Sequence, residues 1–317
     1  VEAPRECGPG ARPLFFTLWP MDASSQPSRQ RAALPFTNCE RLTPITARPA
    51  ATLRSSTACR KTTIRLCLPT LSPYPPPTLR LSRFFIDAPL SLGQHELPEA
   101  QAHYIGRVLR HAAGDAVQLF DGSGQEYLGQ LLEVGKKTVR VSLAEALPGQ
   151  AESPLHIHLG QGLSRGERMD WAIQKATELG VNVITPIVSE RCEVRLKDER
   201  ADKRLAHWRQ VAISACEQCG RSTLPVIHPP QTLSEWLANT AADLKLVLHP
   251  VAEPLASHAR PATLAFLIGP EGGLNDHEVE QAKAAGFQAA RLGPRVLRTE
   301  TAPVVALAVA QQLWGDF

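Results

Sequence analysis

From residue 155 to the C-terminus, short apolar runs alternate with helical segments, and this alternation constrains the fold more than any other feature of the sequence. Residues 244–248 and 263–268 are almost continuously apolar, as expected for strands buried on both faces of a sheet. Segments with a helical pattern, at residues 169–179 and 200–219, alternate along the chain with apolar runs of this kind. Strands that alternate with helices predict an α/β domain around a mostly parallel sheet.

Other elements of this domain have weaker signals. Asn275, followed by Glu278 three residues later, has the pattern of a capping box and predicts the start of a helix that ends at Gly286. The remaining predicted elements are strands at residues 155–159, 183–188 and 289–292 and a last helix that begins near Thr301. Together they predict an α/β domain over residues 154–317.

Residues 81–150 have a different pattern, with short strands predominating. The turn sequence Asp-Gly-Ser-Gly at 121–124 separates predicted strands at 116–120 and 125–134, which is typical of a β-hairpin. The other predicted elements are strands at residues 83–86 and 138–143, a helix at 98–110 and a linker at 147–154. Several short strands with one helix predict a small β-barrel, a shape often used to hold RNA.

Residues 1–80 differ from the rest in composition. They contain 11 Lys and Arg against 4 Asp and Glu, and 13 of the 27 prolines, without a sustained period of two or 3.6 residues. Such a stretch cannot bury enough apolar surface to offset the entropy lost on ordering, so we expect it to be disordered. Three interpretations stay open: a transit peptide, a basic RNA-binding tail, or upstream sequence included by a start site placed too early. The proline density argues against an amphipathic transit helix and favours the last.

The composition does not support a membrane protein or a metalloprotein. No apolar stretch approaches the roughly 18–20 residues needed to cross a bilayer, and there is no recognisable secretory signal. We therefore expect no membrane span and a cytoplasmic location. Cys216 and Cys219 form a C-x-x-C inside a helical segment, without a second pair at zinc-ligand spacing, so we expect no metal.

Three turn segments follow predicted strands. They are Leu-His-Pro at 248–250, GPEGG at 269–273 and LGPRVLRTETA at 292–302. In open α/β sheets, ligands bind outside the carboxyl ends of the strands, and Gly–Pro turns let the backbone approach a ligand closely. Neither glycine loop fits a dinucleotide or a P-loop pattern. Each segment alone could be an ordinary strand-to-helix turn, but together they predict a shared pocket.

Several motifs of the folded part form a recognisable set. They are RFF at 83–85, LFDG at 119–122, DWAIQKATELG at 170–180, SER at 189–191, EQ at 217–218, GR at 220–221, GPEGG at 269–273 and LGPRVLRTETA at 292–302. Through them residues 83–317 resemble the RsmE family. These are bacterial methyltransferases of the SPOUT superfamily that methylate N3 of a uridine in 16S ribosomal RNA.

The resemblance implies a fold, a cofactor and partners. The α/β domain would be tied in a deep trefoil knot, which few folds contain, and the N-terminal β-barrel would be PUA-like and help to bind RNA. The cofactor would be S-adenosyl-L-methionine, with no metal. The protein would act as a homodimer whose active site draws on both subunits, on 16S ribosomal RNA within the assembled small subunit.

The resemblance also implies which residues would hold the cofactor. Backbone and apolar atoms of the three turn segments would surround its adenine, ribose and methionine parts. The candidate cofactor-binding residues are Leu248, His249, Gly269, Pro270, Glu271, Gly272, Leu292, Gly293, Leu297 and Thr301. For the three leucines, core packing is an equally good interpretation, and His249 could be a packed neutral histidine.

Methylation of uridine N3 requires that a proton leave the nitrogen. A base could remove it, or a cation could stabilise the uridine anion as it forms. Arg298 is the candidate cation, and Glu271 and Glu300 are the candidate bases, although either carboxylate could instead cap a helix or pair with an arginine. Arg221 is a candidate for contact with RNA phosphate or the target base, although an arginine at a helix end also complements the helix dipole.

RNA binding is predicted to depend on a local basic patch. The folded part carries a net charge of −4, because residues 1–80 contribute +7 to a chain of net +3. The candidate RNA-binding residues are Arg83, Arg107, Arg110, Arg165, Arg168, Arg191 and Arg221. A solvated, charge-rich helix face is the alternative interpretation for such residues.

Two other functions remain open from the sequence. A SPOUT ribose 2′-O-methyltransferase of transfer or ribosomal RNA would still methylate an N3-blocked substrate. A non-catalytic RNA-binding factor for ribosome assembly would keep the fold without activity. The intact GPEGG and LRTETA sequences argue against loss of catalysis.

We predict that deletion of residues 1–79 leaves folding and methyl transfer unchanged, because this segment lacks the patterns of a packed domain. Thermal unfolding and a methyl-transfer assay of the shortened chain would check this. Loss of either property would contradict it.

Overall fold

The computed structural model describes residues 81–135, 137–193 and 198–317, which fall within one compact unit, Ser72–Phe317. The segment 1–80, for which we predict disorder, lies outside the described residues. No helix of the described residues is both long and apolar enough to span a bilayer.

The C-terminal part is built on a seven-stranded sheet whose pairings are all parallel. Its strands are β6 (His156–Gly162), β7 (Val183–Val188), β8 (Val226–Ile227), β9 (Gln231–Thr232), β10 (Leu244–Pro254), β11 (Thr263–Ile268) and β12 (Gln288–Arg291). The order is β12-β10-β11-β6-β7-β8, and β9 also pairs with β7. The parallel sheet predicted from the alternating pattern is therefore present.

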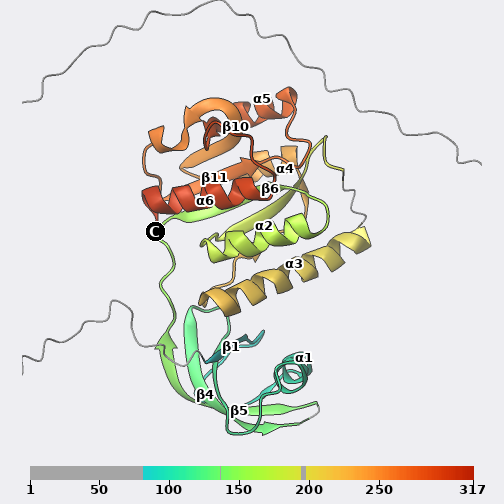
Figure 1. Ribbon diagram of the computed structural model, residues 1–317, viewed down its shortest axis with the longest axis vertical. Helices are drawn as coiled ribbons and strands as arrows, with labels where there is room; N and C mark the ends of the chain where they lie inside the picture. Colours follow the sequence, from blue (N-terminus) through green and yellow to red (C-terminus); the bar gives the residue numbers. More distant parts are fainter. Residues whose placement is uncertain (1–80, 136, 194–197) are drawn as a thin grey trace, which may run out of the picture. The chain divides into compact units, whose positions relative to one another are not determined.

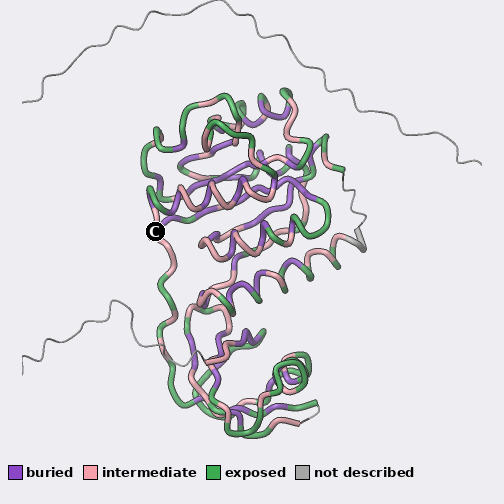
Figure 2. The backbone as a smooth tube through the Cα atoms, viewed as in Figure 1, coloured by how far each residue is buried: buried purple, intermediate pink, exposed green. Residues whose placement is uncertain are grey.

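Helices cover both faces of this sheet (Figure 1). The helices are α2 (Glu167–Glu178), α3 (Asp198–Cys219), α4 (Leu233–Asn239), α5 (Asp276–Ala284) and α6 (Thr301–Trp314). Side chains of α2, α3 and α6 share one apolar core with the sheet, and those of α4 and α5 share another on the opposite face. The central strands β6 and β11 are accordingly buried along most of their length (Figure 2).

The N-terminal part is a five-stranded sheet with its own apolar core. In sheet order its strands are β1 (Ser82–Phe85), β3 (Ala116–Phe120), β4 (Gln125–Val134), β5 (Val139–Pro148) and β2 (Gly93–Leu97). Helix α1 (Glu99–His103) continues into a π-helical turn, η1 (Tyr104–Val108). Among the described residues no pairing joins the edge strands β1 and β2, so the hydrogen-bonded sheet is open rather than a closed barrel.

Several short elements differ from the sequence prediction. Strands β2, β8 and β9 and helix α4 were not predicted, and β5 extends through Pro148 into the expected linker. The start of α4 has a usable signal, because the Thr232 side chain and Glu235 form a capping box. Because β8 and β9 have only two residues each, they have no detectable period and cannot be predicted from periodicity.

The guanidinium of Arg83, a candidate RNA-binding residue, is engaged within the protein. Its side chain is only 12% exposed and pairs with Glu126 of β4. It also donates to the Cys216 carbonyl of α3, at 2.9 Å, and lies over the Phe120 ring. The RFF motif therefore joins the N-terminal sheet to helix α3. In making these contacts, the Arg83 side chain is withdrawn from solvent.

Arg221 is likewise held within the protein, and this burial disfavours its predicted role as an RNA-binding or catalytic group. Its side chain is 7% exposed and grips the Glu152 carboxylate through Nε and Nη2. The Nη1 atom donates to the carbonyl oxygens of Thr177 and Val181, each at 2.9 Å. Four of the five N–H groups of this guanidinium are engaged in these contacts.

We predict that Arg221→Ala lowers the free energy of unfolding by about 2–4 kcal/mol, because it strands two carbonyl groups and a carboxylate that is mostly withdrawn from water. Urea unfolding measures this change. Arg209→Ala is the matched control, since Arg209 pairs with Asp87 at an exposed site and should leave stability close to wild type. Equal effects of the two substitutions would contradict the structural role of Arg221.

Candidate active site

A cavity of about 520 Å³ lies at the ends of β11 and β12, the edge of the sheet predicted for ligand binding, and beside residues 248–250, which lie within β10 rather than after it as predicted. Its walls come from the three turn segments identified in the sequence. Of the predicted cofactor-binding residues, those that line it are Leu248, His249, Gly269, Pro270, Glu271, Leu292, Gly293 and Leu297. Gly272 and Thr301 do not line it, although each is adjacent in sequence to the segments that do.

The cavity wall also contains residues that were not predicted as catalytic or cofactor-binding, and Arg168 among them is a candidate for RNA binding. They are Arg168, Pro250, Ile268, Gly273, Leu274, Val279, Ala290, Arg291, Arg295, Val296, Thr299 and Ala302. Most of these lie within or beside the predicted segments, so proximity in sequence could have found them. Val279 could not have been found in this way, because it reaches the cavity from helix α5.

Close backbone packing shapes the floor of the site. A side chain at Gly162, the last residue of β6, would overlap Pro270 N and Gly269 C. Gly273 adopts a φ of +68°, a left-handed conformation that favours glycine, and its N–H donates to the Pro270 carbonyl at 2.9 Å. The GPEGG segment is thus a tight turn pressed against the end of β6.

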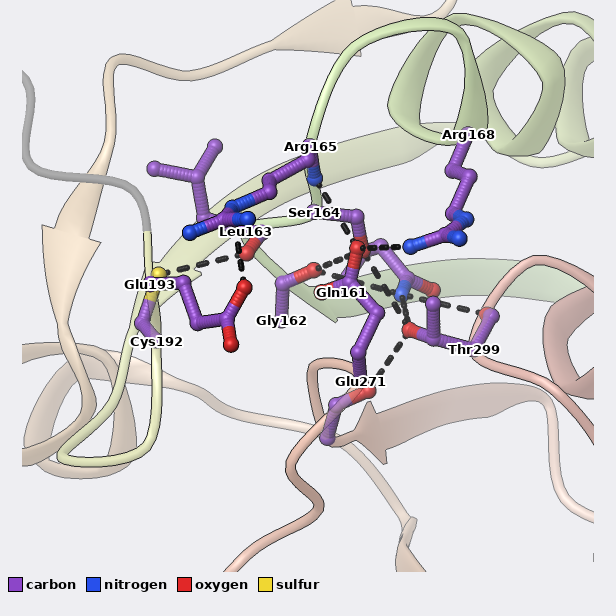
Figure 3. Close-up of polar contacts among 11 residues, drawn as sticks. Gln161, Gly162, Leu163, Ser164, Arg165, Arg168, Cys192, Glu193, Glu271 and Thr299 are labelled. Carbon is purple, nitrogen blue, oxygen red and sulfur yellow. Dashed lines mark hydrogen bonds and ion pairs between the residues drawn. The ribbon is translucent and has the colours of Figure 1, made fainter. Parts of the chain in front are cut away.

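Thr299 connects the last turn segment to this floor (Figure 3). Its hydroxyl donates to the Gly269 carbonyl at 2.8 Å and accepts from Gln161 Nε2 at 3.1 Å. Ser164 Oγ lies 3.3 Å from the same hydroxyl and donates to the Gly162 carbonyl at 3.1 Å. The three side chains are buried, so the network is shielded from water.

Glu271 is held in ion-pair and hydrogen-bond contacts rather than poised as a base. Its Oε1 accepts from the backbone N–H of Arg165 at 3.0 Å and from Arg168 Nη1 at 2.9 Å (Figure 3). Partial burial alone would raise the pKa of the Glu271 carboxyl. The hydrogen bonds from Arg165 and Arg168 outweigh it and hold this pKa below its usual value. A carboxylate with a lowered pKa is a weak proton acceptor, so the prediction of Glu271 as the base does not fit its surroundings.

Arg298 and Glu300 both line the cavity, on either side of Thr299. The Arg298 carbonyl accepts from the N–H groups of Thr301 and Ala302, each at 2.9 Å, and so forms part of the first turn of α6. Within the described part of the chain, no hydrogen bond or ion pair engages the Arg298 guanidinium, which is therefore available to a ligand. Glu300 lies near Arg168 and raises the pKa of that guanidinium further, after the larger effect of Glu271.

The remaining RNA-binding candidates fall into two groups. Arg165, Arg168 and Arg191 surround the GPEGG turn, where Arg165 pairs with Glu193 at 2.8 Å and Arg191 donates to the Gly272 carbonyl at 3.3 Å. Arg107 and Arg110 belong to the N-terminal part and are exposed. Of these five arginines, only Arg168 lines the cavity.

The described residues offer no alternative metal or thiol centre. They contain no group of three or more His, Cys, Asp or Glu that could hold a metal ion. Burial raises the pKa of the Cys216 thiol to about 12, so the C-x-x-C has a protonated, unreactive first cysteine. The cavity is therefore the place where the described residues concentrate candidate chemistry.

Two family models match the chain. Residues 151–311 match the RNA methyltransferase domain, and residues 97–144 match the RNA methyltransferase PUA domain. The first covers the seven-stranded sheet and its helices, and the second covers most of the five-stranded sheet.

Individual relatives agree with the family models. A ribosomal RNA small subunit methyltransferase E from Buchnera aphidicola is 34% identical over 248 residues, covering 75% of this chain and 96% of the relative. A solved methyltransferase from Legionella pneumophila with bound SAM is 40% identical with a TM-score of 0.74, and the match covers 75% of this chain and 100% of that one.

A further solved structure carries the same name as the Buchnera relative. It is a ribosomal RNA small subunit methyltransferase E from Neisseria gonorrhoeae bound to S-adenosyl methionine, 41% identical with a TM-score of 0.71, covering 75% of this chain and 99% of that one. Identity at this level, over nearly the whole length of each relative, establishes common membership. The chain belongs to the ribosomal RNA small subunit methyltransferase E family.

Proposed function

We propose that the protein transfers a methyl group from S-adenosyl-L-methionine to N3 of a uridine in 16S ribosomal RNA. The observation that carries this proposal is the cavity at the ends of β11 and β12, which is walled by the GPEGG and LRTETA segments. Relatives with 40–41% identity bind this cofactor. Choice of N3 as the acceptor follows from the family resemblance.

The cavity walls suit this cofactor in size and chemistry. A volume of about 520 Å³ is within the range of ligand pockets. Leu248, Leu292 and Leu297 offer apolar surface for a flat base, and the glycine turns expose backbone polar groups. S-adenosyl-L-methionine supplies an electrophilic methyl group on a positively charged sulfur atom.

The chain's own residues would manage the charge on the uracil ring. When N3 loses its proton, negative charge spreads over the ring and its carbonyl oxygens, and the unpaired Arg298 guanidinium would stabilise that charge. Glu300 is the cavity carboxylate that remains as proton acceptor, since Glu271 is held by Arg165 and Arg168. The N3 proton would pass to this carboxylate or to water as the N3–carbon bond forms and the sulfur–methyl bond breaks, with S-adenosyl-L-homocysteine as the leaving group.

The proposal includes two details of the fold, a trefoil knot and a PUA-like N-terminal domain. A trefoil knot is supported by the path of the chain after β12, which returns to the ends of β11 and β6 before α6 begins. There Thr299 bonds to Gly269 and Gln161. A PUA-like N-terminal domain is supported by the match over residues 97–144.

A homodimer acting in the cytoplasm on the small subunit completes the proposal. Trp171 on α2 and Leu313 on α6 are each 40% exposed, although both are large and apolar, and these two helices pack against each other. Exposed apolar side chains on adjoining helices favour a protein partner. The family resemblance implies that this partner is a second copy of the same chain.

We predict that wild-type protein methylates small ribosomal subunits that lack the modification, and that the product is 3-methyluridine. Labelled S-adenosyl-L-methionine and mass analysis of nucleosides would identify it. Ribose-methylated nucleosides would favour the 2′-O-methyltransferase instead. No labelled nucleoside on particles or free RNA would favour a non-catalytic assembly factor.

Arg298→Ala should lower kcat by about 100-fold or more, because it removes the cation that stabilises the uracil anion. Single-turnover assays with labelled cofactor can measure the residual rate. Arg260→Ala is the control, since Arg260 is exposed and precedes β11, at the end of the sheet opposite the cavity. A rate for Arg298→Ala within about 3-fold of this control would remove Arg298 from the mechanism.

Light scattering should give a solution mass about twice that of one chain. Trp171→Glu together with Leu313→Glu should shift it toward one chain, because two carboxylates cannot be buried unpaired in an interface. An unchanged dimer in this double variant would place the interface elsewhere.

A further inference from the structure

A cluster of three buried polar side chains lies beside the cavity. The proposed function has not yet given these side chains a role. Gln161, Ser164 and Thr299 are 1%, 3% and 7% exposed. Thr299 stands between the two cavity residues with candidate chemistry, Arg298 and Glu300. The cluster is therefore in a position to control how those two side chains are presented.

Thr299 is the centre of this cluster. Its hydroxyl donates its one proton to the Gly269 carbonyl and accepts from Gln161 Nε2 and, on the other side, approaches Ser164 Oγ. These partners belong to different parts of the fold, because Gln161 lies on β6 and Gly269 follows β11. One hydroxyl thus ties the last turn segment to the ends of two central strands (Figure 3).

Gln161 strengthens the same attachment from below. Its Nε2 also lies 3.4 Å from the Thr299 carbonyl oxygen, so both polar groups of Thr299 face the same amide. Contacts at both the side chain and the carbonyl oxygen restrict rotation of the Thr299 backbone. They therefore also restrict the neighbouring residues Arg298 and Glu300.

The Gln161 amide has an unfavourable feature that stability alone does not explain. Its Oε1 is buried and makes no hydrogen bond within the described part of the chain. An unpaired buried oxygen destabilises the folded state relative to an apolar side chain of the same shape. Gln161 therefore has a role other than stability, and its hydrogen bond to Thr299 identifies that role as orienting Thr299.

From this geometry we infer that Thr299 and Gln161 are positioning residues for methyl transfer, which hold Arg298 in its working orientation. This inference rests on the proposed function, because its effect is expressed through Arg298. It predicts that loss of the Thr299 hydroxyl slows the chemical step and leaves cofactor binding nearly intact.

The test compares Thr299→Val with Thr299→Ser. Valine keeps the shape of threonine and removes the hydroxyl, whereas serine keeps the hydroxyl. We expect kcat to fall about 10-fold to 100-fold in Thr299→Val, as for a small misplacement of catalytic groups. Thr299→Ser should recover to within about 3-fold of wild type. Cofactor affinity measured by calorimetry should change by less than about 3-fold in both variants.

Thr185→Val is the control for loss of a buried hydroxyl. Thr185 is fully buried on β7 and its Oγ1 lies 2.8 Å from His158 Nε2, away from the cavity. This substitution should destabilise the protein to thermal unfolding and leave kcat unchanged. If Thr185→Val and Thr299→Val lower kcat equally, the Thr299 effect is one of general stability and the inference fails.

A double-mutant cycle tests whether Thr299 acts through Arg298. In the Arg298→Ala background, Thr299→Val should change the single-turnover rate by less than about 3-fold, because the group that it positions is gone. A full additional loss would overturn the inference, as would an unchanged kcat in Thr299→Val alone. An inactive wild-type protein would overturn the proposed function itself, so the two failures are distinguishable.

Discussion

The parallel pairing of β6 with β11 determines where the whole site lies. Their register aligns Gln161 with Ile268, so the chain leaves both strands at the same level. The turn that follows β11 therefore begins beside Gly162, where only glycine leaves room for Pro270. Both strands are almost wholly buried, which places them at the centre of the sheet and makes this junction rigid.

Much of this arrangement could be predicted from local sequence. The bounds of β7 and β11 match the predicted ranges, because apolar runs bounded by turn residues are visible without any tertiary information. The Gly–Pro turns marked the ends of strands correctly, and the rule that ligands bind at those ends located the cavity. The capping box at Asn275 and Glu278 is also present as expected.

The sequence could not predict which polar residues find one another. Arg83 and Glu126 are separated by 43 positions, and Arg221 and Glu152 by 69, so their pairing is a property of the folded chain. Gln161 and Thr299 are 138 positions apart, and neither belongs to a pattern that marks it as a partner of the other. Charge and residue type identify candidates for RNA contact, but burial decides which of them solvent or a ligand can reach.

The pairing of arginines with carboxylates has a consequence for how this protein recognises RNA. Arg83, Arg168 and Arg221 are each engaged by a glutamate of the same chain. An arginine that is already neutralised within the protein displaces no bound cations from a phosphate backbone, and displaced cations are what make RNA affinity fall steeply as salt rises. These three arginines therefore add little to the salt dependence of RNA binding, which is left to other basic side chains such as the exposed Arg107 and Arg110.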